Sequence, residues 1–435
     1  MSRIKSMTNL SMYISKLKSL VLSFLCDHTT IKCIDSTSTF QYLACPIRLL
    51  EELSFEHPCH SIVMQTLENF HKKYSGCSCK YFLFFLTNFY EQLTNLIEER
   101  TIFDELDKLI QKSKFIARNQ FAESDLSWNF ETFERICRYQ TNYAQCLHEA
   151  YLHLNLNFKN LIHLTQVRSV EEKSVFLSGL LISTNEKIEG TYRTILLDGY
   201  LLEDYVHVGY NNQMKTKQIS TKSSWFYLIS SILEEYKIDI VLCTGTIDDK
   251  FKTMNNSSRI FIENLSTKIL RLCDENLMIN YLTDLNEENI LQLNYRVYSN
   301  EFTVIEFTHC GTILQCVPCD YLIDLKHEQL SHCIGRCQEI MKTNIYLAGS
   351  GLFETQLYKY IYENEEMNSS SECFLRTLDL FIQELSNRKD LFQSNLIDDF
   401  NSKFDAWTSS IDLLKIFFQI DQILEITDTD DLTDI

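Results

Sequence analysis

Glycine is scarce in this sequence, with 10 glycines among 435 residues, or about 2% where about 7% is usual. Loops that bind nucleotide phosphates present backbone N–H groups to the anion. They usually need glycine, because it adopts positive φ and leaves room for close approach. The chain therefore has few places where a phosphate-binding loop could form.

Basic runs and long apolar runs are also lacking. The formal net charge is −19, and no segment is rich in Lys or Arg. Such a chain would repel nucleic acid and anionic membrane surfaces, so we expect neither as a partner. The strongest apolar stretch, residues 81–86, breaks at Thr87 and Asn88. It is too short to cross a bilayer, so we expect no membrane insertion.

Cysteine, by contrast, is plentiful, with 16 residues. No convincing signal peptide is present, because the apolar run after Lys16 and Lys18 is short and predicts an amphipathic helix. Free thiols in a reducing compartment are therefore favoured. Cys316 and Cys319 have zinc or redox spacing, but no matching second pair accompanies them, so we expect no metal site. No Gly-x-Ser-x-Gly motif occurs, and no catalytic residue is expected.

The order of predicted elements is helical, then mixed, then helical again. Apolar residues recur at spacings of three and four from residue 10 to about 170. Short β-rich runs alternate with helical stretches from about residue 174 to 312. Helices resume from Glu328, apart from a short strand candidate at residues 345–348. The β-rich runs are residues 175–182, 194–197, 238–243 and 259–262. An α/β domain inserted into a helical domain fits this order, and so do three independent domains.

Six short segments occur in the order and spacing found in group II chaperonins. The first has the sequence Leu-Leu-Glu-Glu-Leu-Ser-Phe-Glu-His-Pro, and another has Gly-Ser-Gly-Leu-Phe-Glu-Thr-Gln-Leu. The chain therefore resembles the chaperonin superfamily, and within it the McKusick–Kaufman/Bardet–Biedl syndrome chaperonin-like branch. The matching segments are residues 49–58, 195–203, 239–249, 312–314, 349–357 and 419–423.

The resemblance implies an α+β multidomain fold of chaperonin type. It would have an all-α equatorial domain split between both ends, a split intermediate domain and an α/β apical domain. The implied bounds are 1–118 (equatorial), 119–173 (intermediate), 174–312 (apical), 313–349 (intermediate) and 350–435 (equatorial, truncated).

The same resemblance locates a degenerate nucleotide pocket. Cys26 and Thr29 fall where the family has glycines, Gly76 falls where it has the Mg²⁺-binding carboxylate, and Ile334 falls near its catalytic Asp. A hard cation needs oxygen ligands, and these residues supply none. We therefore expect no ATP hydrolysis and no cofactor, although weak ATP binding stays open. The residues of this pocket are Cys26, Thr29, Lys32, Gly76, Ser78, Gly349 and Gly351.

An unusually apolar helix is predicted over residues 224–233. Phe226, Ile229 and Leu233 share one face and would pack on the apical sheet. Exposed apolar residues mark binding surfaces, unless residues 200–210 cover them. The outward candidates for binding protein clients are Trp225, Tyr227 and Leu228.

By resemblance, the chain is expected to bind proteins without hydrolysing ATP and to assist assembly of the ciliary BBSome complex. Its expected partners are protein clients, other chaperonin-like subunits, the cytosolic chaperonin and BBSome subunits. Its expected location is the cytoplasm, with the centrosome or basal body. An ATP-dependent folding chaperonin and a non-chaperone scaffold that retains the fold are the alternatives. We expect no homo-oligomeric double ring.

Overall fold

The fold is that of a computed structural model. It describes residues 3–5, 8–25, 32–36, 39–43, 46–52, 57, 59–74, 78–94, 101–138, 140–154, 158–167, 171–184, 187–202, 222–253, 259–274, 277–299, 301–387, 396–419 and 423–425.

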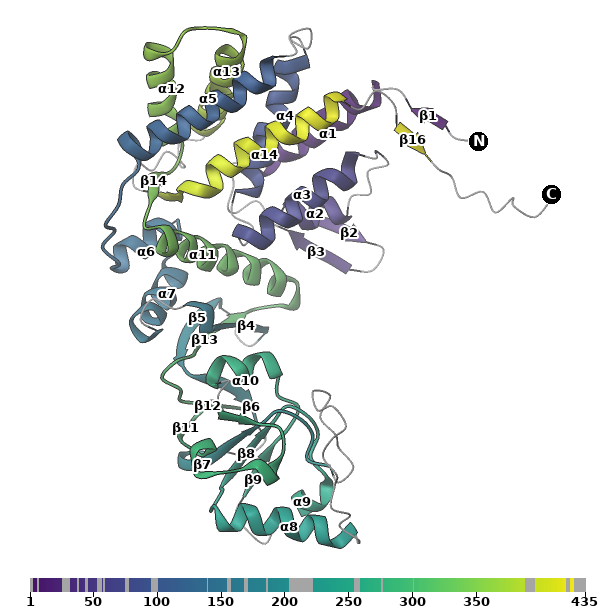
Figure 1. Ribbon diagram of the computed structural model, residues 1–435, viewed down its shortest axis with the longest axis vertical. Coiled ribbons are helices and arrows are strands. Elements are labelled where there is room, and N and C mark those ends of the chain that lie inside the picture. Colours follow the sequence, from purple (N-terminus) through teal and green to yellow (C-terminus); the bar gives the residue numbers. More distant parts are fainter. Residues whose placement is uncertain are drawn as a thin grey trace, which may run out of the picture. The chain divides into compact units, whose positions relative to one another are not determined.

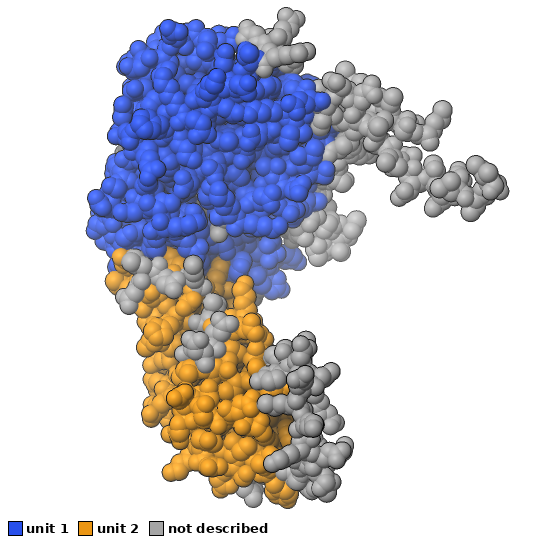
Figure 2. Space-filling model, viewed as in Figure 1, with its two compact units in different colours: residues 1–148, 165–173, 316–435 blue, residues 149–164, 174–315 orange. Residues whose placement is uncertain are grey.

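The chain divides into two compact units (Figure 2). Unit 1 contains residues 1–148, 165–173 and 316–435, and unit 2 contains residues 149–164 and 174–315. Unit 2 is therefore inserted within the sequence of unit 1. The five-segment division into equatorial, intermediate and apical parts stays a prediction.

Unit 1 is mainly helical (Figure 1). Its helices are α1 (Thr8–Leu25), α2 (Pro46–Glu52), α3 (Cys59–Tyr74), α4 (Cys79–Thr94), α5 (Ile102–Ile116) with the π-helical turn η1 (Ala117–Phe121), α6 (Phe130–Ile136), α7 (Thr141–Leu154), η6 (Asp320–Leu322), α11 (Ile323–Thr343), α12 (Leu352–Asn364), α13 (Ser369–Ser386) and α14 (Phe400–Gln419). The last residues of α7 belong to unit 2.

Helix α4 lies at the centre of unit 1. It is buried along nearly its whole circumference, from Cys79 to Leu93, as expected for a helix that is apolar on all sides. Helices α1, α13 and α14 pack against it. The apolar stretch at residues 81–86 is therefore the middle of a helical core, where its aromatic rings contact those of Phe381 and Trp407.

Three small antiparallel sheets also belong to unit 1. They pair β1 (Arg3–Lys5) with β16 (Ile423–Glu425), β2 (Lys32–Ser36) with β3 (Thr39–Leu43), and β14 (Tyr346–Ala348) with β15 (Ile397–Asp399). The expectation that residues 1–118 and 350–435 are all-α was wrong, because β1, β2, β3, β15 and β16 lie there. The short strand expected at residues 345–348 is confirmed as β14. Short strands of three to five residues carry too little periodicity to stand out in a helical background.

Unit 2 is built on a mixed sheet with strand order β6-β12-β11-β7-β8-β9, and β10 pairs with β7. Strands β7, β8 and β9 are parallel, and β11, β12 and β6 are antiparallel to their neighbours. Strands β4, β13 and β5 form a separate three-stranded sheet. The strands are β4 (Leu161–Val167), β5 (Lys173–Ser178), β6 (Leu180–Ser183), β7 (Gly190–Leu197), β8 (Ile240–Cys243), β9 (Ile260–Ile262), β10 (Met278–Ile279), β11 (Leu291–Ser299), β12 (Phe302–Ile305) and β13 (Gly311–Val317).

Helices cover both faces of the parallel strands. Alternate residues of a strand point to opposite faces, so β8 is buried throughout. Ile195 and Val241 pack with α8 (Lys222–Glu235) and α9 (Asp249–Thr253), whereas Leu196 and Leu242 pack with α10 (Thr267–Asp274). The short helices η2 (Phe158–Asn160), η4 (Leu282–Asp284) and η5 (Glu287–Asn289) complete the unit.

The fold is thus a mixed α and β structure of more than one unit. The strands and helices predicted between residues 174 and 312 occur as β5 to β12 and α8 to α10. One predicted strand, residues 175–182, is broken at Gly179 into β5 and β6. An added Cβ there would lie 2.0 Å from the Ile305 carbonyl oxygen, so only glycine fits. Among the described helices, none combines the length and apolarity needed to cross a membrane.

Candidate functional site

The turn Gly349–Gly351 lies against strand β15 in unit 1. The Gly349 N–H donates to the Leu396 carbonyl oxygen at 2.8 Å, and a Cβ added to Gly349 would lie 3.1 Å from the Asp398 carboxylate. Gly351 has a φ of +80° and is the N-cap residue of α12, a conformation that favours glycine. The turn therefore leaves room for the Asp398 side chain beside the start of α12.

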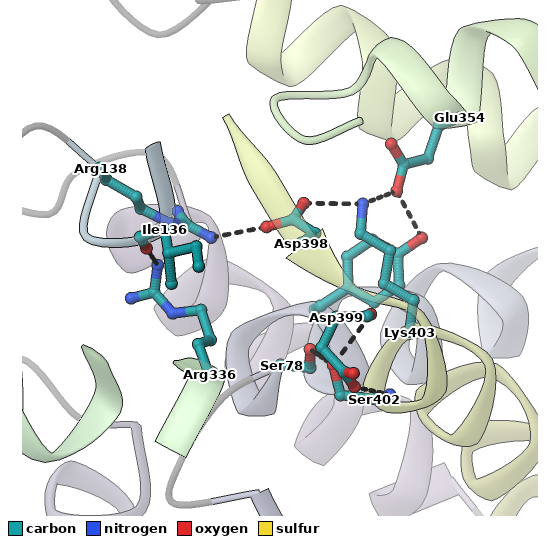
Figure 3. Close-up of polar contacts among 10 residues, drawn as sticks. Ser78, Ile136, Arg138, Arg336, Glu354, Asp398, Asp399, Ser402 and Lys403 are labelled. Carbon is teal, nitrogen blue, oxygen red and sulfur yellow. Dashed lines mark hydrogen bonds and ion pairs between the residues drawn. The ribbon is translucent and has the colours of Figure 1, made fainter. Parts of the chain in front are cut away.

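Lys403 projects from the first turn of α14 towards this carboxylate (Figure 3). Its Nζ lies 2.5 Å from Glu354 Oε1 and 3.0 Å from Asp398 Oδ2. The Lys403 side chain is 5% exposed and that of Glu354 is 0% exposed. The Tyr81 hydroxyl donates to the same Glu354 oxygen at 2.9 Å. Arg138, after α6, lies with its Nη2 3.4 Å from Asp398 Oδ1. These four charged residues, Arg138, Glu354, Asp398 and Lys403, are called the ion cluster below.

Asp398 and Lys403 stay charged at neutral pH. Burial alone would raise the pKa of Asp398, but Lys403 and Arg138 outweigh it, and the pKa is lowered to about 2. Burial alone would lower the pKa of Lys403, but the carboxylates of Asp398 and Glu354 raise it above its ordinary value. Charges removed from water are tolerated only when paired. The cluster meets that condition with its own side chains.

A second polar group adjoins the ion cluster. Asp399 precedes α14 and accepts a hydrogen bond from the Ser402 N–H at 2.6 Å, as a helix N-cap does. The Ser78 hydroxyl, at a residue with a φ of 65°, donates to Ser402 Oγ at 2.9 Å. Burial raises the pKa of Asp399 from 3.8 to about 6, although the hydrogen bonds from Ser402 oppose this.

The raised pKa of Asp399 predicts that the stability of the protein depends on pH. Folded Asp399 binds its proton more tightly than the unfolded chain does, so its ionisation costs stability as the pH rises from about 4 to about 6. Relative to Asp399→Asn, which can still cap α14, the wild type should lose stability on the order of 3 kcal/mol across that window. Urea denaturation of both proteins at pH 4, 5, 6 and 7 measures the difference. A constant difference would contradict the assignment.

The sequence-predicted pocket residues are only partly brought together. Ser78 bonds to Ser402 near the start of α14, and Gly349 lies against Leu396 and Asp398. Gly351, the N-cap of α12, faces Leu385 of α13 instead. The backbone of Lys32 begins β2, but its side chain lies outside the described set. Cys26, Thr29 and Gly76 also lie outside the described residues.

Sequence reasoning missed the groups that dominate the site. Asp398, Asp399, Lys403 and Arg138 were not singled out, and Glu354 was noted only as part of a motif. A signal was available for Lys403. Buried apolar residues recur at three- and four-residue spacing along α14, and Lys403 lies on that face. A lysine on the buried face of a helix predicts a buried carboxylate partner. The apolar residues of this face are Phe400, Phe404, Trp407, Ile411 and Leu414.

The described residues beside the Gly349–Gly351 turn do not fit a magnesium nucleotide. The ammonium of Lys403 lies between the two carboxylates, where it would repel a divalent cation. No group of three or more His, Cys, Asp or Glu side chains suited to a metal occurs among the described residues. Ile334, near the expected position of a catalytic carboxylate, is followed on α11 by Arg336, whose Nη1 donates to the Ile136 carbonyl oxygen at 2.5 Å. The basic side chains of Lys403 and Arg336 therefore bind carboxylates and a carbonyl oxygen of the chain itself.

The predicted client-binding residues of α8 differ in exposure. Tyr227 and Leu228 are 67% and 38% exposed. Trp225 does not point outward as expected, because it is half-buried with its ring edge against Phe251 at 5.5 Å. Phe226 is half-buried, and Ile229 and Leu233 are buried against the sheet. Tyr200 and Leu202, which were considered as a cover, are themselves exposed, and residues 203–210 lie outside the described residues.

The cysteines whose side chains are described are free thiols, and most are buried. Cys316 and Cys319 are half-buried, and Cys333 and Cys337 lie within α11. Burial raises the pKa of Cys59, Cys243 and Cys373 above the ordinary thiol value. Such thiols are protonated at neutral pH and act as small apolar core residues.

Comparison with known proteins gives a limited similarity. No family model matches the chain. Two curated proteins, each described as "Chaperonin-containing T-complex member BBS12", from Homo sapiens and Pongo abelii, are 24% identical to it over 109 residues. The alignment covers 22% of this chain and only 15% of either relative. The chain is thus similar, over part of its length, to a chaperonin-like protein.

Proposed function

We propose that this chain is a chaperonin-like protein that binds other proteins and assists the assembly of a multiprotein complex without hydrolysing ATP. The similarity to BBS12 proteins supports the chaperonin-like part of the proposal. The observation that carries the non-hydrolysing part is the position of Lys403 between Glu354 and Asp398.

The electrostatics of the ion cluster argue against ATP hydrolysis. A carboxylate that activates water works best when its pKa is near the working pH. Asp398, with its pKa lowered to about 2 and its oxygens paired with Lys403 and Arg138, is a poor base. A triphosphate could use Lys403 only by taking it from two buried carboxylates, which would then remain unpaired at high cost. No observation favours the active ATP-dependent chaperonin.

Protein binding is proposed for the exposed side of α8. Tyr227 and Leu228 lie on the side of the helix away from buried Ile229 and Leu233. Tyr200 and Leu202, which follow β7, are also exposed, at 46% and 38%. Large exposed apolar side chains of this kind mark surfaces that bind other proteins.

The partner class follows from the similarity and from the charge. We propose protein clients, other chaperonin-like subunits, the cytosolic chaperonin and BBSome subunits as partners, in the cytoplasm and at the centrosome or basal body. A net charge of −19 disfavours nucleic acid and anionic membranes. A scaffold that keeps the fold but assists no assembly is the second candidate.

Substitution on α8 tests the proposal. Tyr227→Ser with Leu228→Ser is expected to reduce recovery of co-purifying chaperonin-like and BBSome subunits about tenfold, since buried aromatic anchors dominate protein interfaces. Affinity purification with quantitative mass spectrometry measures this. Tyr362→Ser with Ile416→Ser, at residues 61% and 45% exposed in unit 1, is the matched control and should change little. Equal recovery with both pairs would contradict the α8 site, and normal complex assembly after depletion would favour the bare scaffold.

A further inference from the structure

Helices α6 and α11 are joined to each other by a charged hydrogen bond. Arg336, near the middle of α11, donates from Nη1 to the carbonyl oxygen of Ile136, the last residue of α6. The Cys137 thiol, at the C-cap of α6, lies beside the thiols of Cys333 and Cys337 on α11. The two helices therefore behave as one packed element of unit 1.

This element is tied to the rest of unit 1 at two separated points. At one end, Arg138 binds Asp398 of β15 at 3.4 Å, and Asp398 also holds Lys403 of α14. At the other end, Arg48 of α2 lies 2.6 Å from Glu328 and 3.3 Å from Asp324, both on α11. Glu328 and Asp398 are 8% and 14% exposed, whereas Arg48 is 39% exposed, so the carboxylates are the shielded members of the two ties. Burial raises the pKa of Glu328 to about 7, so the Arg48–Glu328 tie is only partly ionic at neutral pH.

All the charges in these ties come from the chain itself. Asp398 divides its two oxygens between Arg138, which follows α6, and Lys403, which begins α14 (Figure 3). The same carboxylate thus links the α6–α11 element to the helical core. No anion or cation from solution is needed to complete the link, and partly buried charged hydrogen bonds of this kind are stronger than neutral ones.

We propose that Arg138–Asp398 and Arg48–Glu328 form a permanent latch that holds α6 and α11 on the helical core of unit 1 in the absence of nucleotide. This inference rests on the proposed lack of ATP hydrolysis and extends it to a lack of nucleotide binding. It adds that the chain keeps one arrangement of these helices. A scaffold for assembly would then present its partners with one fixed form of unit 1.

Hydrogen exchange of the full chain tests the latch. Arg138→Met removes one tie while Lys403 still neutralises Asp398, so the variant is expected to fold. Amide exchange in α6 and α11 should rise about tenfold, as expected for the loss of one hydrogen bond to a charged group. Exchange in α4, at the centre of the core, should stay unchanged. Lys112→Met, which breaks an exposed pair with Glu365, is the control and should leave α6 and α11 unchanged.

The possible outcomes separate the latch from general stability and from nucleotide binding. Unchanged exchange in α6 and α11 of Arg138→Met, or an equal rise in α4, would overturn the latch. Arg48→Met breaks the second tie, Arg48–Glu328, independently of the first and should raise amide exchange in α11. Addition of Mg·ATP to the wild type should change nothing. If Mg·ATP alone protects α11 from exchange, the chain binds nucleotide, and the proposed lack of nucleotide binding is wrong. This result does not depend on whether Arg138→Met loosens the helices.

Discussion

Lys403→Met is expected to lower the free energy of unfolding by about 3–5 kcal/mol, the cost of breaking a buried ion pair by removing one partner. Lys403 is 5% exposed and is the shared partner of Glu354 and Asp398. Methionine has a similar length, so the loss is one of charge rather than of volume. Glu354, whose side chain is 0% exposed, would then be left as a buried carboxylate without its cation.

Urea denaturation followed by circular dichroism measures this loss. Lys112→Met is the matched control, because Lys112 is 56% exposed in its pair with Glu365 and such surface pairs contribute only about 0–1 kcal/mol. Adding Glu354→Gln and Asp398→Asn to Lys403→Met removes the uncompensated charges and should recover most of the stability. A loss with Lys403→Met no greater than with Lys112→Met would mean that the buried ion cluster does not form.

Trp407→Ala should also cost about 3–5 kcal/mol, as is usual when a large aromatic side chain is deleted from a core. Trp407 is fully buried in α14. Its ring contacts those of Phe353, Phe374 and Phe404 at centroid distances between 4.9 and 6.1 Å. The same α14 presents Lys403 one turn earlier, so the core that Trp407 fills also holds the ion cluster in place.

Near-UV circular dichroism and urea denaturation of Trp407→Ala test this packing. Trp128→Ala is the control, because Trp128 is only half-buried and contacts the Phe133 ring at 5.5 Å. It should cost less than half as much. Equal losses for the two variants would contradict the central position of Trp407 in unit 1.

Elements with strong periodicity could be predicted from the sequence. The parallel strand β8 and the helix α8 were expected because Ile238–Cys243 is a short β-branched run and Ile229 and Leu233 share a face. Apolar residues at three- and four-residue spacing predicted a helix over residues 81–96, and it occurs as α4. Its burial on nearly all sides was not predicted. The hairpin β2–β3 and strand β15 were missed, because strands this short give no clear pattern among helices. Strand β14 was expected at residues 345–348 and occurs there.

The site was harder to predict than the fold. The turn at Gly349 and Gly351 was found because residues 349–357 resemble a glycine-containing segment of the chaperonin superfamily. Asp398 and Lys403 lie between the segments at residues 349–357 and 419–423, outside both. Their partners Arg138 and Glu354 are 260 and 49 positions away. Ion pairs over such separations leave no local pattern. Only the tertiary structure shows that two carboxylates share one lysine.

Isothermal titration of Mg·ATP into the purified full-length chain tests the central claim most directly. The account predicts no saturable heat at millimolar nucleotide, because Lys403 and Arg138 already neutralise the carboxylates beside the Gly349–Gly351 turn. Saturable binding that requires Mg²⁺ and is lost in Gly351→Val would contradict it, since it would mean that the ion cluster opens to admit a metal nucleotide.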